Sequence, residues 1–319
     1  MPFLEECVRS ILTQSYANWE LIAVDDHSED GSNVLLLEYA AIEPRIHCHQ
    51  NSGSGIIDAL NKGYSCAKGD FITRMDADDM MPSIKLEILL DQLQKSGRGH
   101  LSTGKVKYIS ETILGDGFKK YEEWLNALCD GDNHYQEIYK ECVIPSPCWM
   151  MYCDDFNDIG GFNSTSYPED YDLCFRMYEN KIKIVASREL LHIWRDHNTR
   201  ASRNDSNYSD NRFLDMKVKY FIRNDYRSDE KLVIWGAGKK GKYIAKLFLQ
   251  NNINFIWITN NDKKIGNNIY TVILKDFSII QQLRGNLNLI LSVANKDEQI
   301  DIIEYIQSRE ELVRLYKFC

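Results

Sequence analysis

The sequence predicts an α/β protein with a mostly parallel sheet, followed by a second and smaller α/β unit. Two observations lead to this prediction. Up to about residue 190, short apolar runs typical of strands alternate with segments whose apolar residues recur at helical spacing. After residue 230 the alternation starts again around a glycine-rich turn. Alternating strands and helices are typical of parallel sheets, because the crossover between two parallel strands usually contains a helix.

The first helix shows this spacing clearly, since Leu4, Val8 and Ile11 recur along one face. The elements that follow it, in chain order, are a strand at 20–24, a helix at 32–41, a strand at 45–49, a helix at 55–67, a strand at 71–75, a helix at 83–95 and a strand near 106–110. Ligands of parallel sheets collect at the carboxyl ends of the strands, and Asp25 and Asp76 both follow strands in this way.

The second unit is predicted to begin after a short charged segment. A polar helix at 208–226 leads to residues 227–230, which contain no apolar side chain and are typical of a linker. We therefore predict one domain at 1–226 and another at 227–319. The second opens with a strand at 232–235, a helix at 242–251 and a strand at 255–258.

Composition excludes several classes of protein. The net charge of −9 argues against a broad nucleic-acid-binding or anionic-membrane surface. The nine cysteines are odd in number and form no Cys-x-x-Cys pair, which favours buried thiols in the reducing cytoplasm over disulfides or a zinc site. No signal peptide is visible, and no apolar run approaches the length of a membrane span.

The acidic run after the strand at 71–75 is the most informative stretch. Asp76, Asp78 and Asp79 place three carboxylates within four residues, and these repel one another unless a cation lies among them. Hard oxygen ligands of this kind select Mg²⁺ or Mn²⁺, which usually keep positions open for substrate phosphates. The alternative is an acidic turn that starts the next helix, because carboxylates favour a first helical turn.

A glycine-rich turn opens the second unit. Gly236, Gly238 and Gly241 form a Gly-x-Gly-x-x-Gly pattern between a strand and a helix, the arrangement that cradles phosphates in dinucleotide-binding folds. The acid expected about twenty residues later is missing, because the next strand ends at Thr259-Asn260-Asn261. We therefore favour a packing role or the binding of another nucleotide over NAD binding.

Together these residues resemble the family 2 glycosyltransferases, which have the GT-A fold. The resemblance covers about residues 3–200. Its motifs are Ser10-Ile-Leu-Thr-Gln-Ser-Tyr16, Val24-Asp-Asp-His-Ser-Glu-Asp-Gly-Ser32, Asn51-Ser-Gly53 with Ala59-Leu-Asn61, Ala67-Lys-Gly69, the acidic run, and Glu169-Asp-Tyr-Asp-Leu-Cys-Phe-Arg176. It implies transfer of a sugar from a nucleotide-diphosphate donor to an acceptor hydroxyl, usually with inversion. The second unit resembles small Rossmann-like domains appended to some bacterial sugar-processing enzymes, and it either holds a nucleotide or serves as a docking module.

The resemblance implies a role for each motif residue. Asp78 would bind the metal, and Asp79 would cap the following helix. The nucleotide-sugar would contact Asp25, Asp26, Asn51, Arg74 and Asp76. For Asp25 and Asp26 an Asx-type turn is the structural alternative.

Two residues of the later motifs complete the implied site. Asp170 would be the general base that activates the acceptor, and the crowding of Glu169 and Asp172 beside it favours a raised pKa. A helix cap is the alternative for Asp170. His197, in an aromatic-Arg-x-His pattern, would complete the metal shell, or it is a structural histidine. The Gln-x-x-Arg-Trp signature of processive synthases is absent, which favours addition of a single sugar.

The implied function is one step of bacterial surface polysaccharide synthesis, with a UDP-sugar as the expected donor and a glycan or lipid-linked acceptor. It would take place in the cytoplasm or at the inner face of the membrane. In the family an apolar strand precedes the first helix, whereas this chain begins at Met1-Pro-Phe-Leu, already inside that helix. We expect either a start assigned too late or a true loss of that strand. Two alternatives therefore remain, a catalytically impaired nucleotide-sugar-binding protein and an NAD-linked oxidoreductase that uses the second unit.

Overall fold

The computed structural model describes residues 2–111, 113–163, 167–198, 200 and 212–319. The chain divides into two units. The first contains residues 1–135 and 143–204, and the second contains residues 136–142 and 205–319. The helix that the sequence predicts before the charged segment therefore belongs to the second unit.

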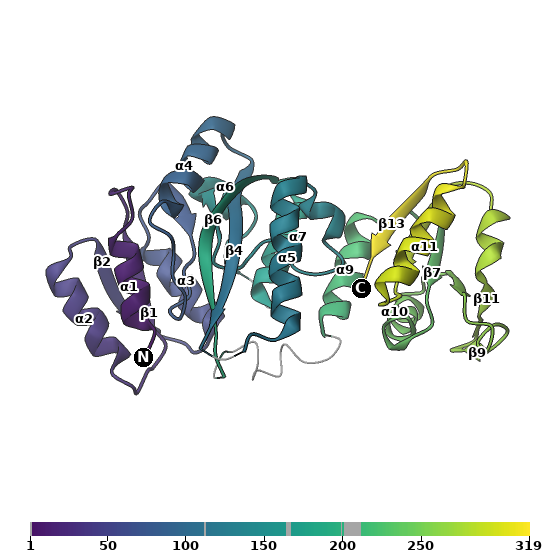
Figure 1. The fold of residues 1–319 in the computed structure, drawn as a ribbon, viewed down its shortest axis with the longest axis horizontal. Coiled ribbons are helices and arrows are strands. Elements are labelled where there is room, and N and C mark those ends of the chain that lie inside the picture. Colours follow the sequence, from purple (N-terminus) through teal and green to yellow (C-terminus); the bar gives the residue numbers. More distant parts are fainter. Residues whose placement is uncertain (1, 112, 164–166, 199, 201–211) are drawn as a thin grey trace. The chain divides into compact units, whose positions relative to one another are not determined.

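The first unit contains the alternating helices and strands that the sequence predicts (Figure 1). Its elements are α1 (Leu4–Leu12), β1 (Leu21–Asp25), α2 (Ser32–Ile42), β2 (Ile46–Gln50), α3 (Ile56–Cys66), β3 (Phe71–Thr73), α4 (Lys85–Ser96), β4 (His100–Ser110), α5 (Asp116–Gly131), β5 (Trp149–Tyr152), α6 (Cys153–Asp158), α7 (Glu169–Glu179) and β6 (Lys183–Asp196), with a 3₁₀ turn η1 (His134–Glu137) at the boundary. β4 begins earlier than predicted, and β6 is a long strand that the sequence did not reveal.

Two sheets organise the first unit. β1 and β2 form a parallel pair, and four strands form a sheet in the order β3-β5-β4-β6. β5 runs antiparallel to both of its neighbours, whereas β4 and β6 run parallel from His100 beside Lys183 to Ser110 beside Asp196. The end of β6 lies beside the residues that follow β3, where Met80 pairs with Ile193. The candidate site is built there.

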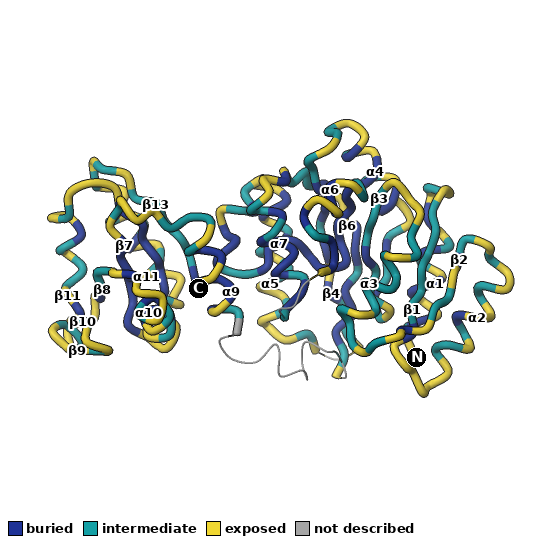
Figure 2. The backbone as a smooth tube through the Cα atoms, turned by 180° about the vertical axis from the view of Figure 1, so that it is seen from behind, coloured by how far each residue is buried: buried dark blue, intermediate teal, exposed yellow. Residues whose placement is uncertain are grey.

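Helix α4 illustrates how local sequence and packing agree. Leu86, Leu89, Leu90 and Leu93 recur at helical spacing, and all four are buried. The helix ends at Gly97, whose φ of +78° is a left-handed conformation that glycine adopts without steric cost. In Figure 2, β4 is buried along much of its length, whereas α2 is mostly intermediate or exposed.

The second unit is a doubly wound α/β domain. Its elements are α9 (Arg212–Asn224), β7 (Lys231–Trp235), α10 (Lys239–Gln250), β8 (Ile256–Thr259), β9 (Asn268–Ile269), β10 (Val272–Ile273), β11 (Lys275–Asp276), a 3₁₀ helix η3 (Phe277–Gln281), β12 (Leu287–Leu291), α11 (Lys296–Gln307) and β13 (Val313–Lys317). Five parallel strands form its sheet in the order β11-β8-β7-β12-β13. The order reverses between β7 and β12, the position at which such folds bind ligands. The predicted α/β class, mostly parallel pairing and Rossmann-like second unit are confirmed.

The glycine-rich turn lies at the end of β7, and its three glycines have different surroundings. Gly236 has a φ of +122°, which other residues rarely adopt. A Cβ on Gly241 would lie 2.2 Å from the carbonyl oxygen of Gly236, so the close approach of α10 to β7 requires glycine there. A Cβ on Gly238 would meet no atom within 4 Å. Backbone conformation therefore explains Gly236 and packing explains Gly241, but neither explains Gly238.

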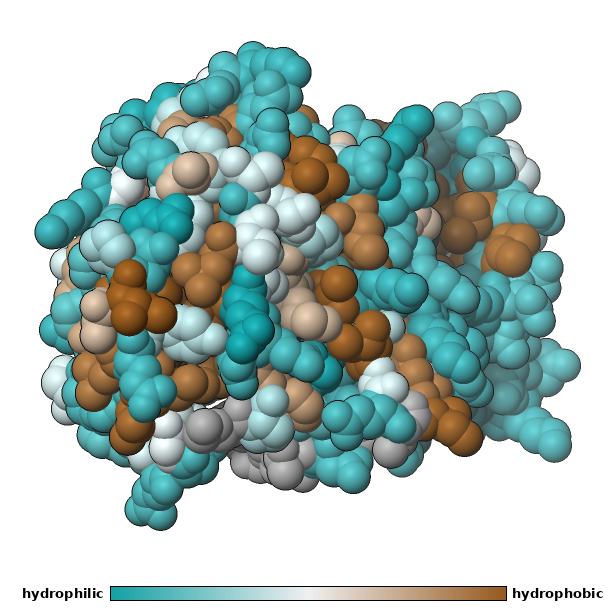
Figure 3. Space-filling view, turned by 60° about the vertical axis from the view of Figure 1, so that its left-hand side comes forward, coloured by the Kyte–Doolittle hydropathy of each residue, from teal (hydrophilic) through white to brown (hydrophobic). Residues whose placement is uncertain are grey.

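The described helices include none that is both long and apolar enough to cross a membrane. Large exposed apolar side chains include Val34, Leu37 and Ile42 of α2. On the face drawn in Figure 3, hydrophobic side chains alternate with hydrophilic ones. The apolar surface on that face is divided into patches.

The glycine turn yields a prediction about stability. Gly241→Ala should destabilise the second unit by about 1–3 kcal/mol, because the added methyl group must displace backbone atoms. Gly238→Ala is the matched control and should change stability by less than about 0.5 kcal/mol, since its methyl group enters open space. Chemical unfolding of both variants measures the difference. Equal stability of the two would contradict this account of the turn.

Candidate active site

The acidic run leaves β3 and then lies against the far end of β6. Met80 donates its backbone N–H to the carbonyl of Ile193 at 3.0 Å, and Ile193 donates to the carbonyl of Met80 at 2.9 Å. These two hydrogen bonds pair the residue that follows the acidic run with β6 as a short antiparallel bridge. The carboxylates are thereby held in one conformation although they repel one another.

Asp78 and His197 form the first functional pair. His197 immediately follows β6, and its Nε2 lies 2.9 Å from Oδ2 of Asp78. Arg195 donates its Nε to the backbone carbonyl of Asp78 at 3.0 Å. The end of β6 therefore holds both the side chain and the backbone of Asp78.

Asp79 has a different role from the one expected. Its side chain is fully buried, and its Oδ1 accepts the backbone N–H of Arg195 at 2.8 Å. Its Oδ2 lies 3.0 Å from Nε2 of His192. Burial and the nearby carboxylates of Asp76 and Asp78 raise the pKa of Asp79 to about 8. The expected helix cap is wrong, because the N-cap residue of α4 is Ile84.

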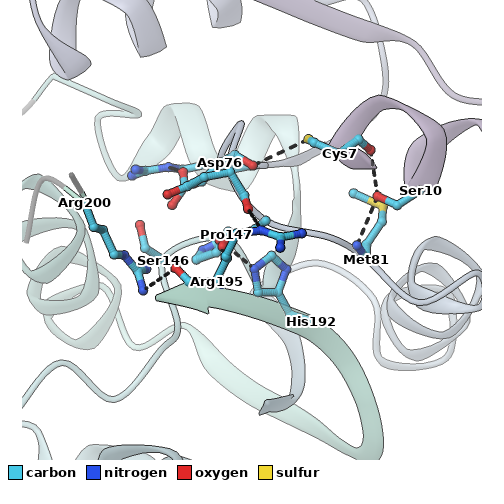
Figure 4. A network of polar contacts seen from close by, with 12 residues as sticks. Cys7, Ser10, Asp76, Met81, Ser146, Pro147, His192, Arg195 and Arg200 are labelled. Carbon is cyan, nitrogen blue, oxygen red and sulfur yellow. Dashed lines mark hydrogen bonds and ion pairs between the residues drawn. The ribbon is translucent and has the colours of Figure 1, made fainter. Parts of the chain in front are cut away.

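Helix α1 supports the acidic run from the other side (Figure 4). The Cys7 thiol donates to the carbonyl of Asp76 at 3.6 Å. Ser10 accepts the backbone N–H of Met81 at 3.2 Å. The amide of Gln14 donates to a backbone carbonyl just beyond the run, that of Pro82, at 2.8 Å. Two polar side chains of α1 and that of Gln14 just beyond it, each about one turn apart, thus satisfy backbone groups along or next to the run.

Arg74 joins the acidic run to the start of α7. Its Nε lies 2.9 Å from Oδ1 of Asp76, and its NH1 lies 2.9 Å from Oε1 of Glu169. Burial lowers the pKa of the Arg74 guanidinium, but the carboxylates around it have the larger combined effect and raise it above its ordinary value. Burial and the charge of Glu169 raise the pKa of Asp170 to about 7.

A pocket opens beside Asp170. Its wall combines four polar side chains with apolar and aromatic ones, and the lining residues are Arg74, Ser146, Glu169, Asp170, Ile144, Trp149, Phe162, Leu173, Cys174 and Met177. Ser146 Oγ and Glu169 Oε2 are buried, and neither has a hydrogen-bond partner among the residues described. Buried polar atoms are normally hydrogen-bonded, so these two oxygens are available to a polar group that enters the pocket.

Asp25, Asp26 and Asn51 come together at the ends of β1 and β2. Asp26 Oδ1 accepts the side-chain amide of Asn51 at 2.6 Å, and Asp26 Oδ2 accepts the backbone N–H of Gly55 at 2.8 Å. The backbone N–H of Asn51 donates to the carbonyl of Asp25 at 2.8 Å. Asp25 Oδ2 also accepts the backbone N–H of Ser28 at 3.3 Å, the local contact of the structural alternative. These contacts fix the loops at the end of the parallel pair.

Comparison with known proteins identifies the family. The model of "Glycosyl transferase family 2" matches residues 1–160, which is half of the chain. The chain belongs to this family. The GT-A fold is shared with solved structures whose sequences differ widely. One is Staphylococcus aureus TarS 1–349 in complex with UDP-GlcNAc, with a TM-score of 0.54, 14% identity and coverage of 77% of this chain and 68% of that one.

Further similar proteins extend the comparison. A mannosyltransferase of Pyrobaculum calidifontis, solved with GDP-Man and Mn²⁺, has a TM-score of 0.50 at 16% identity and covers 78% of this chain and 66% of that one. A putative teichuronic acid biosynthesis glycosyltransferase of Bacillus subtilis is 36% identical over 32% of this chain and 41% of the relative. The putative glycosyltransferase EpsE of the same species is 29% identical over 66% of this chain and 75% of the relative. This family 2 chain spans 31% to 47% of the length of three relatives that are 31% to 39% identical to it.

Asp78 and His197 could hold a divalent cation whose remaining coordination positions are filled by substrate. Among the described residues no three His, Cys, Asp or Glu side chains are arranged as a full metal shell. Asp78 and His197 present one oxygen and one nitrogen side by side, whereas Asp76 is engaged by Arg74. Mg²⁺ and similar ions are commonly bound by one or two carboxylates together with substrate phosphates, so two protein ligands are a fitting set.

The predicted site residues of this family 2 chain fall into three groups. Asp76 pairs with Arg74, which lines one pocket with Asp170, and the neighbouring Asp78 pairs with His197, so these five form one group. Asp25, Asp26 and Asn51 form a second group, and Gly236, Gly238 and Gly241 lie in the second unit. The sequence did not point to Ser146, Lys85 or His192. Each is an isolated polar residue among apolar neighbours, and that is the one signal in the sequence that points to them.

Proposed function

We propose that the first unit moves one sugar from a nucleotide-diphosphate donor to an acceptor hydroxyl, with inversion at the anomeric carbon. The observation that carries this proposal is the network that joins Asp78 and His197, through the acidic run and Arg74, to Asp170 and its pocket. A site of this kind places groups for the leaving diphosphate at one end and a base for the acceptor at the other.

At the donor end, Asp25, Asp26 and Asn51 would contact the nucleotide, and Asp76 with Arg74 would lie toward the sugar. Asp78 and His197 would hold Mn²⁺ or Mg²⁺, which neutralises charge on the diphosphate as the sugar–phosphate bond breaks. Their 2.9 Å separation supports this assignment, because two ligands of one ion must lie close together.

At the acceptor end, Asp170 would take the proton of the acceptor hydroxyl. The acceptor oxygen then forms a bond to the anomeric carbon, while the bond from that carbon to the diphosphate oxygen breaks and its electron pair leaves with the diphosphate. A base works best when its pKa lies near the working pH, and the raised pKa of Asp170 supports this role.

The names of relatives support the type of pathway. Relatives include glycosyltransferases named for teichuronic acid and colanic acid biosynthesis. We therefore propose a step of surface polysaccharide synthesis on a glycan or lipid-linked acceptor, carried out in the cytoplasm or at the inner membrane face. Structural neighbours hold UDP-GlcNAc, UDP or GDP-Man. We propose a UDP-sugar as the donor.

Metal dependence provides the first test of this proposal. Asp78→Asn should lower sugar transfer by about 100-fold or more, because the amide is a poorer ligand for a hard cation. A chelator should have the same effect on the unaltered protein, and Mn²⁺ should restore activity. Asp91→Asn is the control, since Asp91 is 54% exposed and pairs with Lys95 within α4. Full activity in chelator would refute the metal assignment.

The base assignment has its own test. Asp170→Asn keeps the shape of the side chain but cannot accept a proton, so transfer should fall by about 100-fold or more while donor affinity changes little. In the unaltered protein the rate should rise with pH through about 7, as Asp170 loses its proton. An equal loss of donor affinity would place Asp170 in the donor site. Donor binding without transfer by the unaltered protein would indicate a nucleotide-sugar-binding protein instead.

We propose that sugar transfer is confined to the first unit and that the second unit acts separately. All of the proposed donor, metal and acceptor residues lie in the first unit. Gly238→Phe would fill the open space beside the glycine turn, where a phosphate would otherwise approach the backbone. Transfer should be unchanged, as measured with a nucleotide-sugar panel. Loss of transfer with an intact second unit would show that the turn contributes to the reaction, and binding of NAD that this change abolishes would favour an oxidoreductase role for that unit.

A further inference from the structure

Three titratable side chains lie in the interior beneath the acidic run. Asp79, Lys85 and His192 have no exposed surface. They come from three separate elements, namely the acidic run, the first residue of α4 and β6. Burying ionisable groups is unfavourable unless each is hydrogen-bonded or paired. The presence of three such groups in one place therefore needs an explanation.

The contacts among them form an unbroken chain. His192 Nε2 lies 3.0 Å from Asp79 Oδ2, and His192 Nδ1 lies 3.2 Å from Lys85 Nζ. The Lys85 ammonium also donates to the carbonyl of Pro147 at 2.6 Å. With Lys85 as an ammonium, which can only donate, Nδ1 of His192 accepts and the ring proton on Nε2 faces Asp79. The imidazole of His192 thus links the side chains of Asp79 and Lys85, and Figure 4 shows it close to Pro147.

The two ends of this chain border the two ends of the site. Asp79 directly follows Asp78, and its other oxygen is held by the backbone of Arg195. Pro147 directly follows Ser146, whose buried hydroxyl lines the pocket beside Asp170. The pocket lining includes none of the four hydrogen-bonded residues Asp79, His192, Lys85 and Pro147. The chain therefore connects the backbone that carries the metal-binding carboxylate to the backbone that forms the pocket wall.

We propose that the buried chain Asp79–His192–Lys85–Pro147 is a positioning device that holds the metal-binding run and the Ser146 wall of the pocket at fixed places. The inference rests on the proposed function for its purpose, but its geometry is independent of that function. His192 is the central positioning residue, because its Nε2 contacts Asp79 of the acidic run and its Nδ1 contacts Lys85, which bonds to Pro147.

Two substitutions of His192 separate the two ends. In His192→Gln the amide nitrogen replaces Nε2, so the bond to Asp79 is kept and the bond to Lys85 is lost. In His192→Asn the amide oxygen replaces Nδ1, so the bond to Lys85 is kept and the bond to Asp79 is lost. The two variants are similar in polarity and size, and each serves as the control of the other.

Amide hydrogen exchange reports on each end separately. The Met80 amide, bonded to Ile193, reports on the acidic run, and the Cys148 amide, bonded to the carbonyl of Pro145, reports on the pocket wall. His192→Asn should speed exchange at Met80 by about tenfold and leave Cys148 unchanged, and His192→Gln should do the reverse. If both variants loosen both segments equally, or neither segment, the positioning role is refuted.

Mn²⁺ binding, measured by electron paramagnetic resonance, connects this test to the proposed function. His192→Asn should weaken Mn²⁺ binding by about 10- to 100-fold, the usual effect of losing a residue that orients a metal ligand, and His192→Gln should not. If the unaltered protein binds no Mn²⁺, the proposed function fails while the exchange pattern still decides the inference. Asp79→Ala, which removes the carboxylate that His192 contacts, should reproduce the His192→Asn pattern and serves if that variant does not fold.

Discussion

Repulsion among carboxylates is the constraint on which the first unit depends. Asp76, Asp78 and Asp79 lie within one short run, and Glu169 and Asp170 approach it from α7. Such a cluster is stable only where cations and hydrogen-bond donors surround it. Many of the residues near the site are cations or hydrogen-bond donors that contact these carboxylates.

Groups on two sides of the acidic run stabilise its carboxylates. Arg74, buried between two carboxylates, compensates the side that faces α7. On the other side, β6 contributes the backbone N–H of Arg195 and the side chain of His192, and His197 follows directly after the strand. A single strand can do this because alternate residues of a strand point to opposite faces, and the chain turns away just beyond its end. The asymmetry leaves Asp78 beside a histidine and Asp76 beside an arginine, which supports the proposal that Asp78 binds a cation and Asp76 contacts substrate.

The second unit is governed by packing and not by charge. Its sheet reverses order beside the glycine turn, and Gly241 permits α10 to approach β7 closely. Trp235 and Trp257, on the two adjacent strands β7 and β8, are both buried. The turn therefore has a structural purpose even without a ligand, which explains why the pattern alone is weak evidence for nucleotide binding.

The sequence by itself determined the helices and strands up to α4, the acidic run and the place of Asp170 at the start of a helix, because these depend on residues close together in the chain. Apolar spacing encodes α4, and a run of acids after a strand is visible without a fold. Only the tertiary structure decided the partners. His192 meets Asp79 across 113 positions, and Lys85 meets Pro147 across 62. Such pairs depend on the register of β6 against β4, which long-range packing sets and local pattern does not reveal. For the same reason the interior role of Asp79 differs from the helix cap that its neighbours suggest.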